Sequence, residues 1–161
     1  MTEPVLRGET GGGRDHVLRG TRAPVRDVRH HLLELHRALV DAERQEYERS
    51  RGRLSDGDFL DALINDPAFS WLGGLTALIV RLDELLEEEP AQPASLADCV
   101  AQIQKLLKPD ADGSDFQRRY ADLLQRSPEV GVAHGNTVRA LRACGPNPGY
   151  AHPRTGPEPR S

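Results

Sequence analysis

The sequence predicts an all-helical fold: a four-helix-type bundle with additional short helices and disordered N- and C-terminal tails. Apolar residues recur at alternating spacings of three and four, as on one face of an α-helix. No segment keeps the two-residue alternation of a half-buried strand. Aromatic residues are only 4% of the 161 residues, so the core depends on Leu, Val, Ile and Ala, and this composition favours helices over a sheet sandwich.

One helical domain over residues 24–144 lies between two tails, residues 1–23 and 145–161. The first tail contains five glycines, and the second alternates Pro, Gly and polar residues. Neither can bury enough apolar surface to offset the entropy lost on ordering. We therefore expect both tails to be disordered.

The first helix is predicted over residues 24–51. Pro24 suits a first helical turn, and apolar residues follow at helical spacing until the pattern breaks near Gly52. Ser55 then provides an N-cap for a short second helix that carries Phe59 and Ile64.

The third helix is predicted to begin at the boundary Asn65-Asp66-Pro67 and to end at Pro90. Its apolar arc is the widest in the chain, which predicts that it is the central helix. The pair Gly73-Gly74 within this helix indicates close approach to a neighbouring helix, a kink or a local helix break. In the case of close approach, Gly131 and Gly135 on the sixth helix are expected to supply the matching surface of small residues.

Three further helices complete the domain. Ser95 is predicted to cap a fourth helix that reaches Leu107, and a fifth follows the linker at residues 109–114. The sequence Ser127-Pro128-Glu129 predicts the N-cap and first turn of a sixth helix, which continues to Gly145.

Composition excludes several classes of protein. Two cysteines, Cys99 and Cys144, make neither a disulfide framework nor a cysteine-only zinc site. The longest uncharged stretch, residues 67–80, has fourteen residues and is too short to span a bilayer. The first residues lack a signal pattern, so we expect no membrane association and a cytoplasmic protein.

Charge is distributed unevenly along the chain. Residues 54–115 carry three basic and thirteen acidic groups, a net charge of −10, whereas both flanking segments are net positive. Solvated helix faces explain this pattern, and an acidic face that docks a basic partner is the alternative. Basic residues form no stripe with interleaved aromatics, which argues against nucleic-acid binding.

Polar residues fall inside the predicted apolar arcs. With 100° per residue, His36 lies within the arc of the first helix, and Arg29 and Glu43 follow the same line seven residues to either side. His134 lies within the arc of the sixth helix, and Asp83 lies at the edge of the third.

Two interpretations of these residues stay open. His36, Glu43, Asp83 and His134 are ligand types for a metal or small molecule in a bundle core, although no Glu-x-x-His pair is present. Alternatively, Arg29, His36 and Glu43 belong to a polar core network in which Arg29 pairs with Asp83 or Glu43. The sequence predicts no catalytic residue and no cofactor, so a bound metal ion is only the alternative. His30-His31 is expected to be exposed on the polar side, where a weak surface metal site is a further option.

Three parts of the chain carry a resemblance: residues 36–44 with 47–48, residues 65–72 with 75–83, and residues 120–134, which read HRALVDAER with YE, NDPAFSWL with LTALIVRLD, and YADLLQRSPEVGVAH. Together they resemble a group of small bacterial all-helical proteins with no assigned function. The pair Gly73-Gly74 departs from the pattern of these relatives. The resemblance covers roughly residues 25–142. It implies a bacterial cytoplasmic helical protein and transfers no binding or catalytic residue.

These observations favour a non-enzymatic protein that acts through protein–protein contact, with a protein partner or a second copy of itself. The alternative is a helical bundle that binds a metal, cofactor or small molecule through His36, Glu43, Asp83 and His134.

Overall fold

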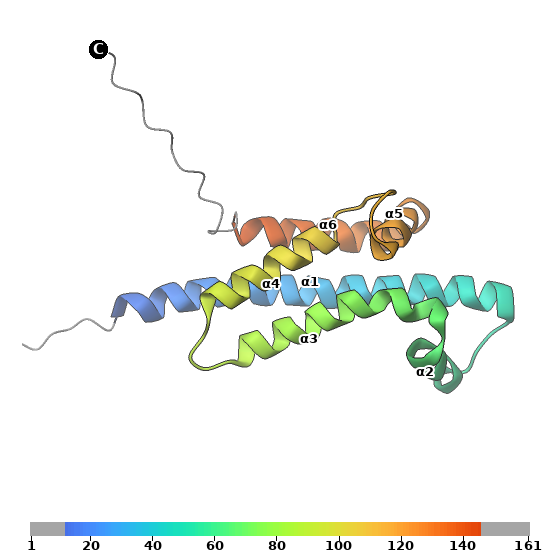
Figure 1. The fold of residues 1–161 in the computed structure, drawn as a ribbon, viewed down its shortest axis with the longest axis horizontal. Coiled ribbons are helices and arrows are strands. Elements are labelled where there is room, and N and C mark those ends of the chain that lie inside the picture. Colours follow the sequence, from blue (N-terminus) through green and yellow to red (C-terminus); the bar gives the residue numbers. More distant parts are fainter. Residues whose placement is uncertain (1–11, 146–161) are drawn as a thin grey trace, which may run out of the picture.

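The computed structural model describes the backbone of residues 12–145 and the side chains of residues 22–145 (Figure 1). Every regular element in this part of the chain is helical, so the predicted all-α fold is confirmed. Residues 1–11 and 146–161, which belong to the two predicted disordered tails, lie outside these described ranges. In chain order the elements are α1 (Gly12–Arg51), α2 (Asp56–Asn65), the 3₁₀ helix η1 (Pro67–Leu72), α3 (Gly73–Glu87), α4 (Pro93–Leu106), α5 (Asp115–Arg126) and α6 (Pro128–Ala143).

Helix α1 begins twelve residues before Pro24, so the prediction that Pro24 opens the helix is wrong and residues 12–23 are helical. Pro24 lies inside the helix, where it lacks a backbone N–H to donate. A long-range contact lies in this added part of the helix, two residues before Pro24. The Arg22 guanidinium donates to Glu89 Oε1 and to the carbonyl oxygen of Glu88, both at 2.6 Å, and so ties this turn to the segment after α3.

Short polar side chains cap the helices where the sequence predicts them. The Ser55 hydroxyl accepts a hydrogen bond from the backbone N–H of Asp58 at 3.1 Å, and this contact starts α2. Ser127 accepts from the backbone N–H of Val130 at 3.3 Å at the start of α6. Both predicted caps are confirmed.

Helix α4 begins earlier than predicted. Its first residue is Pro93 and its cap position is Gln92, so Ser95 lies in the first turn rather than at the cap. Proline at the first turn needs no backbone donor, which explains why the helix starts there.

The predicted third helix is two helices of different type. Asp66 accepts a hydrogen bond from the backbone N–H of Ala68 at 2.9 Å and caps the 3₁₀ helix η1, which begins at Pro67 as the sequence predicts. The α-helical hydrogen-bond pattern takes over only at Gly73. The junction of the two helix types therefore falls at the glycine pair, where the sequence left a local helix break open.

The glycines do not serve a close helix contact. A Cβ added to Gly73 or Gly74 would meet no atom within 4 Å, and the same holds for Gly131 and Gly135. The prediction that these positions form two matching small surfaces is therefore wrong, because each one faces open space.

No single described helix has the length and apolar character needed to cross a membrane. The segment Pro67–Glu87 together with α2 is sufficiently long and apolar, but the pair bends by 70°.

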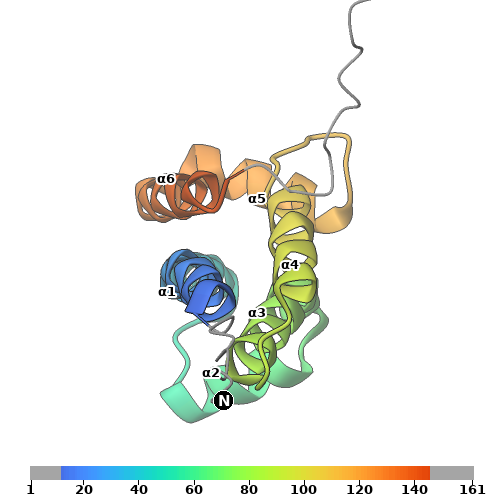
Figure 2. The same cartoon turned by 90° about the vertical axis from the view of Figure 1, so that its left-hand side faces the viewer.

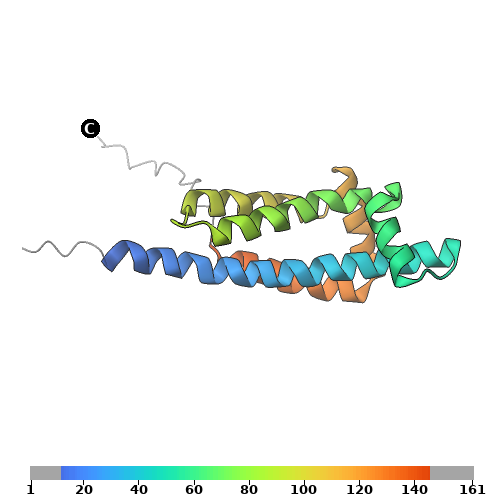
Figure 3. The same ribbon diagram turned by 90° about the horizontal axis from the view of Figure 1, so that it is seen from below.

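Helix α1, rather than α3, is the central helix. It packs against α3, α4 and α6, and α4 also packs against α3 and α6 (Figure 2). The prediction of a central third helix is wrong because α3 is only 15 residues long, whereas α1 has 40 and runs past the others (Figure 3). Helices α2 and α5 and the 3₁₀ helix η1 gather near the C-terminal end of α1 (Figure 1).

One apolar core joins all seven elements. Aromatic side chains from α2, η1 and α5 fill the part of the core where these three elements gather. The ring centroids of Trp71 and Phe116 lie 5.3 Å apart, and those of Phe59 and Phe69 lie 5.6 Å apart. The long helices contribute mainly aliphatic side chains to the remainder: Val25, Val28, Leu32, Leu35 and Leu39 from α1, Leu75, Ile79, Leu82, Leu85 and Leu86 from α3, Leu96, Val100 and Ile103 from α4, and Val130 and Leu141 from α6.

Candidate functional site

Arg29 and Asp83 link α1 to α3. The Nε of Arg29 donates to Oδ1 of Asp83, and this hydrogen bond and the carboxylate charge raise the pKa of Arg29. Both side chains keep more than a third of their surface exposed, so the pair contributes at most about 1 kcal/mol to stability. This is one of the two partners predicted for Arg29.

His36 also bridges α1 and α3. Its Nε2 lies 3.1 Å from the Thr76 hydroxyl, and that hydroxyl donates to the carbonyl oxygen of Leu72 at 3.2 Å. With its own proton directed at Leu72, the Thr76 hydroxyl accepts from Nε2 of His36 in the tautomer that carries a proton there. Burial lowers the pKa of His36, which keeps the ring neutral at neutral pH.

His134 lies in a different environment. Its Nδ1 lies 2.5 Å from the hydroxyl oxygen of Tyr120, a fully buried residue of α5. Burial raises the pKa of Tyr120 and lowers the pKa of His134. The two groups therefore form a neutral hydrogen-bonded pair between α5 and α6.

Glu43 has a third set of neighbours. Burial raises the pKa of its carboxyl group, while the Trp71 indole N–H and the positive charges of Arg119 and Arg126 lower it. The indole nitrogen is buried and makes no hydrogen bond of normal geometry to any described residue. Glu43 therefore faces η1 and α5, away from the α3 contacts of Arg29 and His36.

The four predicted site residues do not form one shared site. His36 bonds to Thr76, Asp83 pairs with Arg29 and His134 bonds to Tyr120, so each is held by its own partner. The half-buried stripe of Arg29, His36 and Glu43 exists as predicted, but its members bind different elements rather than one another. Arg29 pairs with Asp83, one of the partners that the polar-network interpretation gave it.

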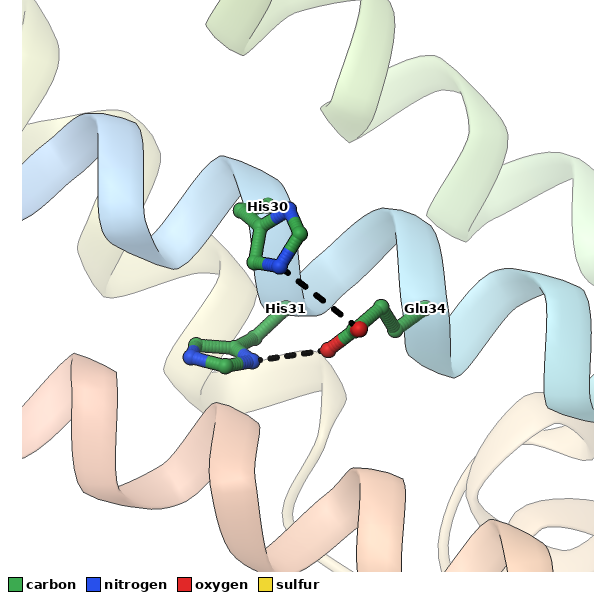
Figure 4. A group of neighbouring side chains, drawn as sticks. All are labelled: His30, His31 and Glu34. Atoms are coloured by element: carbon green, nitrogen blue, oxygen red, sulfur yellow. Dashed lines mark hydrogen bonds and ion pairs between the residues drawn. The ribbon is translucent and has the colours of Figure 1, made fainter.

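The structure instead brings together His30, His31 and Glu34 on α1. Their ligand atoms all lie within 4.8 Å of one another, and they are the only such group of three His, Cys, Asp or Glu residues among the described side chains (Figure 4). The sequence placed His30-His31 on the polar side and left a surface metal site open. It missed Glu34 as the third member, although a spacing of four from His30 puts the two on one helix face.

The chain was compared with protein-family models, with curated proteins and with solved structures, and none of the three comparisons found a match. No relative therefore identifies the family or assigns a role to any residue.

An apolar strip follows the outer side of the α1–α3 pair. Arg29 contacts Asp83 and His36 contacts Thr76, so the two helices run antiparallel in a defined register. Leu33 lies between the two contacts on α1, four residues after Arg29 and three before His36.

The matching position on α3 is Val80, which lies between Thr76 and Asp83. Leu33 is 40% exposed and Val80 is 51% exposed, so two large aliphatic side chains are open to solvent at matching positions of the α1–α3 register. Half-buried Val40 and exposed Ala77 and Gly73 continue the strip toward η1. We call Leu33, Val40, Gly73, Ala77 and Val80 the α1–α3 face.

Other large exposed apolar side chains lie elsewhere. On α2, Leu60 is 57% and Ile64 is 71% exposed, and Val132 on α6 is 66% exposed. Helix α2 also carries three aspartates and no basic residue, so negatively charged side chains surround Leu60 and Ile64.

Proposed function

We propose that the protein acts through protein–protein contact, without catalysis, and that the α1–α3 face binds a second copy of the chain. The observation that carries this proposal is the exposed pair Leu33 and Val80, bracketed by two cross-helix contacts. Two packed helices hold the strip in a fixed geometry, so binding would order little further structure.

The charges beside the face suit a symmetric contact. Arg29 and Asp83 already neutralise each other, and Arg37 lies near Asp41, with Nε 3.9 Å from Oδ2. In a two-fold dimer each copy presents both signs of charge, so opposite charges can meet. Helix α2 suits such a contact less well, because its aspartates would face aspartates of the other copy.

The small side chains of the face also favour helix packing. Gly73 and Ala77 leave room beside Val80, and a Cβ at Gly73 would meet nothing within 4 Å. A helix of a second copy can therefore approach this part of α3 closely, as small residues permit at helix interfaces.

The polar side chains support a non-catalytic role. Arg29, His36 and His134 are each engaged by a structural partner from another helix. Both cysteines are free, with Cys99 buried and Cys144 half-buried, which supports our proposal that the protein works in a reducing, cytoplasmic setting.

Sedimentation velocity over a range of concentrations tests the proposal. We expect Leu33→Glu and Val80→Glu each to weaken dimerisation at least about tenfold, because a carboxylate would be buried without a partner. Leu60→Glu on α2 is the matched control and should leave the dimer unchanged. A wild-type chain that stays monomeric at high concentration, or a dimer that only the α2 variant disrupts, would overturn it.

A further inference from the structure

We infer that His30, His31 and Glu34 form a surface site for a divalent transition-metal ion of the zinc type. The three residues occupy one turn of α1, and Figure 4 shows both rings turned toward the same carboxylate. Nδ1 of His31 lies 2.9 Å from Oε2 of Glu34, and Nε2 of His30 lies 3.6 Å from Oε1. The site is separate from the α1–α3 face and does not rest on the proposed function.

The spacing of the ligand atoms suits a metal of this size. Two ligands held about 2.1 Å from a tetrahedral zinc ion are about 3.4 Å apart. The two distances to Glu34 lie on either side of that value, and the histidine nitrogens are within 4.8 Å of each other. Small side-chain rotations therefore bring all three atoms to bonding distance without moving the helix.

A neighbouring carboxylate is placed to orient one of the rings. The Nε2 of His31 lies 3.6 Å from Oδ1 of Asp27, on the opposite side of the ring from Glu34. When Nδ1 binds a metal, Nε2 must carry the proton and can donate it to Asp27. A carboxylate that holds the second nitrogen of a metal-bound histidine strengthens metal binding in many proteins.

The backbone beneath the site is anchored. The Thr137 hydroxyl of α6 lies 3.1 Å from the backbone carbonyl oxygen of His31, and the side chain of His31 is only 24% exposed. His30 and Glu34 are more open, with 66% and 49% of their side chains exposed. Water can therefore complete the coordination on the solvent side.

The ligand set selects the class of metal. Two imidazoles with one carboxylate suit zinc and its neighbours in the first transition series, whereas Mg²⁺ and Ca²⁺ prefer oxygen ligands alone. We therefore expect Zn²⁺ and Co²⁺ to bind and Mg²⁺ not to bind.

Titration calorimetry of the full, untagged chain with Zn²⁺ tests the site. His16→Gln and His152→Gln are placed in the background so that other histidines do not compete. We expect one ion per chain, and about a tenfold or greater loss of affinity for His30→Gln, His31→Gln and Glu34→Gln. Asp41→Asn is the matched control, because it removes an exposed carboxylate from the same helix, and its affinity should not change.

Long-range ¹H–¹⁵N spectra of the histidine rings supply a second readout that does not depend on stability. Zinc should shift Nδ1 of His31 and Nε2 of His30 and leave the nitrogens of His36 and His134 unchanged. The proposal is overturned by an absence of stoichiometric binding, by equal affinities for Glu34→Gln and Asp41→Asn, or by shifts at His36 or His134.

Discussion

The hydroxyl oxygen of Tyr120 lies 2.5 Å from Nδ1 of His134, and this contact joins α5 to α6. Tyr120 is one of the largest fully buried side chains. Because burial raises the pKa of the phenol and lowers the pKa of the imidazole, both groups are neutral at pH 7. A single proton therefore bridges the phenol oxygen and Nδ1 of His134.

Tyr120→Phe should destabilise the protein by about 1 to 2 kcal/mol, because it leaves a half-buried imidazole nitrogen without its hydrogen-bond partner. Urea unfolding at pH 7 measures the change. His134→Gln and the double variant complete a double-mutant cycle, in which the two single losses should not add. Additive losses, or a loss below about 0.3 kcal/mol for Tyr120→Phe, would show that the contact contributes nothing.

Stability should fall as the pH drops below about 6.5. Burial lowers the folded-state pKa of His36 and of His134 from the ordinary value of 6.5. Below pH 6.5 the two histidines take up protons in the unfolded chain while they stay neutral in the folded protein. The free energy of unfolding therefore has its full value above pH 6.5 and decreases below it. Glu43 acts in the opposite direction at lower pH, because its raised pKa lets the folded protein take up a proton before the unfolded chain does.

Urea unfolding between pH 7.5 and 5.5 measures this slope, with His36→Gln/His134→Gln as the comparison. The double variant should show a flatter profile over the same range. Histidine NMR titration should give midpoints below 6.5 for both residues. Midpoints at or above 6.5, or an unchanged slope in the double variant, would contradict the burial of these rings.

Alanine at Gly74 or Gly135 should raise stability by about 0.5 to 1 kcal/mol each, because Ala restricts the unfolded chain and favours the helix. A Cβ meets nothing within 4 Å at either position. Gly52→Ala is the control of opposite sign, because its φ of +91° lies in the region that L side chains rarely adopt. Thermal unfolding compares the three, and a destabilising Gly74→Ala would mean that α3 has a close neighbour there.

Local sequence signals predicted most helix boundaries. Ser55, Asp66 and Ser127 cap helices as predicted, because a cap depends only on a side chain and the two or three residues after it. The sequence did not predict the helical residues before Pro24, where Arg22 contacts Glu88 and Glu89, more than sixty residues away. The spacing of apolar residues along one helix does not reveal a contact with a distant part of the chain.

The candidate site shows the same limit. Helical periodicity correctly predicted that His36 and Glu43 are half-buried. It did not reveal that His36 faces α3 while Glu43 faces η1 and α5, because the partner helix depends on the packing of the whole fold. His30 and Glu34 lie within one helix, so their spacing of four could have paired them from the sequence, although that pairing was not made.

The most direct measurement of self-association through the α1–α3 face is an isotope-filtered NOE experiment on a mixture of labelled and unlabelled chains. Such a spectrum reports only contacts between copies. The account predicts intermolecular NOEs from the methyl groups of Leu33 and Val80. Their absence at concentrations where the chain is dimeric, or intermolecular NOEs from Leu60 and Ile64 instead, would contradict it.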